Sequence, residues 1–242
     1  MTLIENNMLI FIHGMCNIPE AWDPMIEYFE KRNYSGKAID LRFDLNLKKT
    51  HISDYVEKVK SIATKDDICI GHSLGGLIVQ KLAEESSIKA AVAICSAPPK
   101  GIKFSFPLGI ALSSIRYLPK VVLNQPFKPS YPLVKKLLLH GLDDGEMKSS
   151  KKEYDKLGDD SAIVIKELIM RKISVDEKKV TCPILFIAAE NDLACSPSTV
   201  KQMANKYNAD FKLYKCCHHF FSNKNWEDVA EGIYQFITSL DN

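Results

Sequence analysis

Short runs of apolar residues alternate along the chain with segments in which apolar residues recur every three to four positions. Four of the runs contain no polar alternation, which is typical of strands buried on both faces of a parallel sheet. These runs cover residues 8–12, 68–70, 90–95 and 184–189, and weaker runs cover 37–41 and 211–214. The alternation predicts an α/β fold with a doubly wound, mostly parallel sheet of about six strands.

Helix start signals follow two of these runs. Asn17 and Glu20 have the spacing of a capping box in front of an apolar helical face. Ser196 precedes Pro197, which is a favoured pair at the start of a helix. We therefore expect a helix directly after each of these cap residues.

Residues 100–179 break the alternation, because they show helical patterns but no clear strand. The interval is too long for a plain loop. We expect it to form a helical cap over one end of the sheet. The predicted domains are an α/β core of residues 1–99 and 180–242 and a cap of residues 100–179.

A Gly-x-Ser-x-Gly motif joins a predicted strand to a predicted helix. Gly71 and Gly75 flank Ser73 in this motif, although the whole chain has only 11 glycines. A serine in such a turn is strained, and the turn exposes its hydroxyl at the carboxyl ends of the strands. Ser73 is therefore the candidate nucleophile.

A serine hydroxyl becomes a good nucleophile only when a base accepts its proton. His218 and His219 follow the last predicted strand, at the sheet edge where Ser73 is expected. Asp192 follows the strand at 184–189, and a carboxylate there could orient the base. The order Ser, Asp, His predicts a catalytic triad.

With these residues the chain resembles an α/β-hydrolase of the serine esterase or lipase type. The resemblance includes His13-Gly14 after the first strand and covers residues 9–240. The two strands that usually precede that first strand in the family are missing here, which implies six strands. The match to a histidine followed by an aromatic residue implies that His219 is the base, with His218 as the alternative.

The same resemblance implies an oxyanion hole built from two backbone N–H groups. One belongs to Leu74, the residue after the nucleophile. The other belongs to the loop after the first strand and is assigned to Met15, with Cys16 as the alternative.

Composition limits which binding partners and which cellular compartment are expected for the protein. The 32 basic and 30 acidic residues give a net charge of +2, so no nucleic-acid partner is expected. Seven cysteines without framework spacing, and no secretory signal, indicate reduced thiols and a cytoplasmic location. No cofactor motif is found, and four adjacent residues, 216–219, cannot easily surround one metal ion. We therefore expect neither a cofactor nor a metal.

Residues 100–142 contain seven basic residues and no acidic residue. Between the basic residues lie the apolar residues Phe104, Phe106, Leu108, Ile110, Leu112, Tyr117, Val121, Val122, Leu123, Phe127 and Tyr131, among others. An apolar lid with a basic fringe would suit an anionic amphiphile or peripheral contact with a membrane. The alternative is an ordinary cap core with solvated lysines.

These features together predict a serine hydrolase that cleaves small-molecule carboxylic esters, including lipid-like acyl esters, through an acyl-enzyme. Two alternatives stay open. One is an acyl-thioesterase, and the other is a non-catalytic ligand-binding protein on the same fold.

Overall fold

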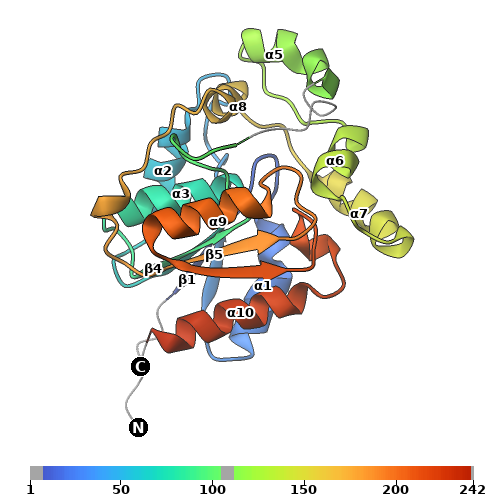
Figure 1. Ribbon diagram of the computed structural model, residues 1–242. Helices are drawn as coiled ribbons and strands as arrows, with labels where there is room; N and C mark the ends of the chain where they lie inside the picture. The colour runs from blue at the N-terminus through green and yellow to red at the C-terminus, as the bar shows by residue number, and fades with distance from the viewer. Residues whose placement is uncertain (1–7, 105–111, 241–242) are drawn as a thin grey trace.

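The computed structural model describes residues 8–104 and 112–240 (Figure 1). Phe106, Leu108 and Ile110 of the predicted lid lie outside the described residues. The strands are β1 Leu9–Ile12, β2 Gly36–Ile39, β3 Ile68–His72, β4 Ala90–Ile94, β5 Ile184–Ala189 and β6 Asp210–Tyr214. They form one sheet in the order β2-β1-β3-β4-β5-β6, and every neighbouring pair is parallel. The predicted six-stranded parallel sheet is confirmed.

Helices cover both faces of the sheet (Figure 1). The core helices are α1 Asp23–Glu30, α2 Ile52–Lys60, α3 Leu74–Glu84, α9 Pro197–Tyr207 and α10 Trp226–Ser239. Alternate residues of a strand point to opposite faces. Ile10 and Ile12 therefore join the core cluster with α2, α3 and α9, whereas Leu9 and Phe11 join the cluster with α1 and α10. Burial on both faces explains why the strand runs show no polar alternation.

Of the two helix caps expected from the sequence, the structure contains one. Ser196 does cap α9, because its side chain accepts the N–H of Thr199. Asn17 does not cap a helix, and that prediction is wrong. A 3₁₀ turn, η1 Pro19–Trp22, comes first and begins after Ile18. The Asn17 Oδ1 instead accepts the N–H of Ile18 at 2.9 Å, which leaves its amide nitrogen free to face another residue.

The segment between β4 and β5 is helical in its described part. It contains η2 Ile115–Tyr117, α5 Leu118–Val122, α6 Tyr131–Leu138, α7 Asp144–Lys156, α8 Ala162–Ile169 and η3 Glu177–Lys179. We call residues 100–179 the insertion; their treatment as a separate cap domain stays a prediction. Within the described residues, an isolated antiparallel bridge between Phe127 and Asp160 is the insertion's one β contact.

The insertion contacts the loops at the carboxyl ends of the strands. The N–H of Gly158 donates to the carbonyl of Cys16, after β1, at 3.0 Å. The N–H of His219, after β6, donates to the carbonyl of Leu138 at 3.1 Å. The insertion therefore lies at the sheet edge where the sequence places its candidate chemistry. None of the helices described is both long and apolar enough to cross a membrane.

Candidate active site

Ser73 sits in the tight turn between β3 and α3. Its backbone is left-handed, with φ 54° and ψ −113°, a conformation that is strained for a residue with a side chain. Two bonds hold the turn: Ser73 N–H donates to Ile94 O, and Ala97 N–H donates to Ser73 O, both at 2.9 Å. The turn is thus fixed to the end of β4 as well as to its own strand.

The two motif glycines are required by close backbone packing. A Cβ atom added at Gly71 would overlap the carbonyl of Gly75, and one added at Gly75 would overlap the carbonyl of Ile12. Only glycine lets β1, β3 and the start of α3 approach this closely. The Gly-x-Ser-x-Gly spacing is therefore the spacing that this turn needs.

Asp192 follows β5 and is almost fully buried. Its Oδ1 accepts the backbone N–H groups of Ala194 and Cys195, each at 2.7 Å. Its Oδ2 lies 2.7 Å from Nδ1 of His218, which is also buried. A carboxylate held by two backbone donors can fix the tautomer and the ring orientation of the histidine beside it.

His219 does not contact Asp192, so the expected pairing of these two residues is wrong. The Nδ1 of His219 lies 3.0 Å from the hydroxyl of Ser222, in η4 Phe220–Ser222, and its Nε2 lies 3.4 Å from Nδ2 of Asn17. Its backbone N–H donates to the carbonyl of Leu138 in the insertion. The alternative residue, His218, takes the position beside the acid.

The environment of His219 also differs from that expected of a base. Burial, together with the nearby charge of His218, lowers the pKa of His219 to about 4. An imidazole with such a pKa is neutral at pH 7 and accepts a proton poorly.

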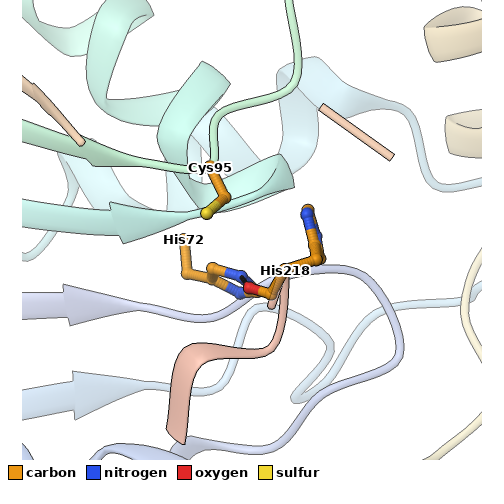
Figure 2. Close-up of side chains that lie close together, drawn as sticks. All are labelled: His72, Cys95 and His218. Carbon is orange, nitrogen blue, oxygen red and sulfur yellow. Dashed lines mark hydrogen bonds between the residues drawn. The ribbon is translucent and has the colours of Figure 1, made fainter. Parts of the chain in front are cut away.

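His72, the residue before the nucleophile, supports the loop that carries His218. Its Nε2–H donates to the carbonyl of His218 at 2.9 Å, and the two rings lie 4.9 Å apart (Figure 2). Burial holds the pKa of His72 well below its usual value, so its ring is neutral. Figure 2 shows His72 on β3, Cys95 at the end of β4 and His218 after β6 converging at one sheet edge.

The loop after β1 lies against the nucleophile turn. A Cβ atom at Gly14 would be 3.1 Å from Cβ of Ser73. In this loop, Nδ1–H of buried His13 donates to the carbonyl of Gly14 at 2.8 Å, and its Nε2 accepts the N–H of Leu41 at 3.2 Å. His13 therefore orders the loop.

Two backbone donors are available at this point. Neither the N–H of Met15 nor that of Leu74 forms a hydrogen bond with another described residue. The N–H of Cys16, the alternative donor, is already bonded to Oδ2 of Asp160 at 2.7 Å. The role of Met15 and Leu74 as an oxyanion hole stays a prediction.

Asp160 links the insertion to this loop, a role that no sequence pattern indicates. Its side chain is buried, and its Oδ1 accepts from the hydroxyl of Tyr55 at 2.6 Å and from the N–H of Ser161 at 2.8 Å. Beside it, Arg42 donates to the carbonyl of Asp159 at 3.1 Å and to that of Asn17 at 2.5 Å. These bonds fix the loop after β1 to the insertion.

The described chain contains two groups of residues whose metal-ligand atoms lie within 4.8 Å of one another. The first group is His72, Cys95 and His218, and the second is Asp192, Cys195 and His218. Asp192, in the second group, already bonds His218 and two backbone N–H groups. Burial, followed by the charge of Asp192, raises the pKa of both thiols well above its usual value.

A six-stranded parallel sheet, a strained serine between strand and helix, and a buried His–Asp pair define the α/β-hydrolase class. The chain belongs to the family described as "Serine aminopeptidase, S33", whose family model matches residues 49–223. Membership of this family supports a hydrolase. No curated protein matches the sequence.

Solved structures agree on the fold. An enol-lactonase from Burkholderia xenovorans has a TM-score of 0.74 at 15% identity, over 97% of this chain and 92% of its own. A lipase-esterase related protein from Clostridium acetobutylicum has 0.71 at 21% identity, over 96% and 95%. A monoacylglycerol lipase from Paleococcus ferrophilus has 0.70 at 17% identity, over 96% and 94%. At such identities the likeness shows the fold alone.

Proposed function

We propose that the protein hydrolyses carboxylic esters, with Ser73 as nucleophile, His218 as base and Asp192 as the acid that orients it. The observation that carries the proposal is the 2.7 Å bond between buried Asp192 and His218, at the same sheet edge as the strained Ser73 turn. A purely ligand-binding protein would need neither the bond nor the strain. This assignment replaces His219 by its neighbour.

In the first half-reaction, Oγ of Ser73 attacks the acyl carbon while its proton passes to Nε2 of His218. The carbonyl oxygen becomes an oxyanion, which the N–H groups of Met15 and Leu74 are placed to receive. Asp192 stabilises the imidazolium. The C–O bond to the alcohol then breaks, and the alcohol leaves with the proton from His218.

In the second half-reaction, water gives a proton to His218 and attacks the acyl-enzyme. Collapse of the second tetrahedral intermediate releases the acid and returns the proton to Ser73. Both steps require Oγ and Nε2 within about 2.6–3.2 Å, a contact that often forms only when substrate is bound. No step in this scheme uses a cofactor.

The surroundings of the site favour an acyl group without a positive charge. Residues 100–142 provide no carboxylate to pair with a substrate ammonium. Glu153, whose charge reaches His219, is bonded to Lys156 on the same helix, α7. These features support an ester rather than a peptide with a free amino end, which the family description would suggest.

The test combines a fluorophosphonate probe with a substrate panel. We expect wild type to be labelled and Ser73→Ala to remain unlabelled. The panel holds p-nitrophenyl esters from acetate to palmitate, acyl-CoA thioesters and amino-acid p-nitroanilides. Turnover should be highest for an ester, and its chain-length profile would measure the acyl site. Faster turnover of thioesters would favour the thioesterase, and a folded wild type that is neither labelled nor active would favour ligand binding.

A further inference from the structure

Exposed apolar side chains are concentrated at one corner of the insertion. In the described chain, seven of the ten exposed large apolar residues belong to residues 112–123 or to the end of α8. We call these seven the α5–α8 patch: Leu112, Ile115, Leu118, Val122, Leu123, Ile169 and Met170. Each of the seven is 57–66% exposed. α5 lies at the outer end of the molecule, away from the sheet (Figure 1).

The segment formed by η2 and α5 has two apolar sides. Tyr117 and Val121, four positions apart, pack inward on Phe127 and on α8. Ile115, Leu118 and Val122 are also spaced three and four apart, but they are exposed. The inner side is sufficient to attach the segment to the insertion. The outer side therefore has no packing role within the described chain.

The charges around the patch have one sign. Arg116 and Lys120, also four positions apart, are exposed between the two apolar sides, and Lys172 follows the end of α8. Residues 100–142 contain no acidic residue. Glu167, on α8, is occupied by the ring of His51 at 2.7 Å and by the N–H of Ile52 at 2.9 Å. An apolar surface with a basic rim is complementary to anionic lipid.

We propose that the α5–α8 patch docks on an anionic phospholipid bilayer, with the apolar residues inserted at the headgroup boundary and Arg116 and Lys120 paired with lipid phosphates. A second copy of the chain is a poorer occupant, because two such basic rims would repel one another. The cluster beneath the patch also contacts Met15 of the candidate oxyanion loop. Docking would therefore bring the end of the molecule that carries the active site to the membrane.

Vesicle sedimentation tests the proposal without using turnover, so its failure is separable from failure of the proposed function. Wild type should sediment with vesicles of phosphatidylcholine and phosphatidylserine and should stay in solution with phosphatidylcholine alone. Leu118→Asp with Val122→Asp should weaken binding at least about 100-fold, since each buried leucine-sized side chain contributes about tenfold or more. Leu213→Asp changes a leucine on β6 that is 52% exposed, and it should leave binding unchanged.

A second pair of variants tests the charges. Arg116→Gln with Lys120→Gln should weaken binding roughly 25-fold, at about fivefold per basic residue, and added salt should reproduce the loss. Lys37→Gln with Lys65→Gln removes exposed lysines near the opposite ends of the strands and should have no effect. All variants should turn over a soluble ester as wild type does.

Three results would overturn the proposal. Wild type could remain in solution with every vesicle. The Leu213 control could lose as much binding as the patch variants. Alternatively, gel filtration could show a dimer that the Leu118 and Val122 changes convert to monomer, which would make the patch an interface between copies.

Discussion

Helix α3 of the core and helix α5 of the insertion are buried to very different degrees. Nine of the eleven residues of α3 are buried, whereas none of the five residues of α5 is. α3 packs against β3 and β4, and its first residues form the nucleophile turn. The candidate nucleophile therefore rests on a helix of the core, whereas α5 lies on the surface of the insertion.

The kinds of contact differ as well. At the strand ends, the backbone itself fixes the site, through the glycine packing at Gly71 and Gly75 and the backbone donors to Asp192. In the insertion, single polar contacts such as those of Asp160 and of the Leu138 carbonyl reach the site loops. Changes at the strand ends should therefore affect chemistry, and changes in the insertion should affect positioning and access.

The largest effect should come from the two adjacent histidines. His218→Asn should lower kcat by about 10⁴–10⁶-fold, the range found when a triad member is lost. His219→Asn is the matched control: it keeps a polar side chain for Ser222 and should change kcat less than about tenfold. Steady-state ester turnover measures both. The reverse ranking would restore His219 as the base and would break the assignment made from the Asp192 bond.

Asp160 tests how far the insertion controls chemistry. In Asp160→Asn, an amide N–H must face either Cys16 N–H or Ser161 N–H, so the loop that carries Met15 should shift. We expect kcat to fall about 10- to 100-fold with KM little changed, less than the ~10²–10³-fold cost of removing an oxyanion donor.

Tyr55→Phe is the control for Asp160, because it removes one bond to the same carboxylate but leaves the Cys16 contact intact. Its kcat should stay within about twofold of wild type, although its thermal stability falls. If both variants lost stability and activity in proportion, Asp160 would contribute to stability alone. The insertion would then not position the loop that carries Met15.

The sequence predicted the core better than the details of the site, for physical reasons. Apolar runs buried on both faces identify parallel strands, and the glycines around Ser73 identify their turn through backbone packing that depends on local sequence. After β6 the chain leaves strand geometry, so neighbouring residues point in unrelated directions. Sequence alone could not decide between His218 and His219, and the aromatic neighbour favoured the wrong partner for Asp192.

Contacts between segments that are distant in the chain could not be predicted from the sequence either. Asn17 has the pattern of a helix cap, but its amide faces His219, 202 positions away. Asp160 contacts Cys16 across 144 positions, within an interval whose helical patterns indicate only exposed surface. Such roles depend on how the insertion is placed on the core, which no local pattern records.

Two histidines with lowered pKa values, His219 and His72, should make stability depend on pH. Burial and the charge of His218 lower the folded-state pKa of His219 to about 4, below the usual 6.5. The unfolded chain therefore binds more protons between these values, and stability present above pH 6.5 is lost as pH falls toward 4. We expect the free energy of unfolding in urea to fall by about 1–2 kcal/mol from pH 7 to pH 5.

His72 should contribute to this loss in the same direction, because burial lowers its pKa too. His219→Asn should retain only the His72 part, so its stability should vary less with pH than that of wild type. Equal pH dependence in both proteins would mean that His219 is solvated and that the loop after β6 is held less firmly than the core.

The smallest expected effect is a difference between the core and the insertion in the rate at which their cysteines react with a thiol reagent. All seven cysteines are free, and six of them are buried, with Cys182 the partly exposed one. Burial, followed by the charge of a nearby aspartate, raises the pKa of Cys16 and of Cys95 well above its usual value, so both should react slowly with a thiol reagent at pH 8. About one thiol should react quickly, and Cys182→Ser should abolish that phase.

The labelling rate of Cys16 measures opening of the insertion, and that of Cys95 measures opening of the core. Cys95 lies at the end of β4 within the core, whereas Cys16 lies beneath the insertion, with its thiol donating to the carbonyl of Phe127 at 3.7 Å. Mass spectrometry of labelled peptides over time gives each rate. If Cys16 reacts well before Cys95, the insertion opens locally while the core stays closed. Equal rates would mean that both sites are exposed only by global unfolding, and that the insertion is as firmly closed as the sheet.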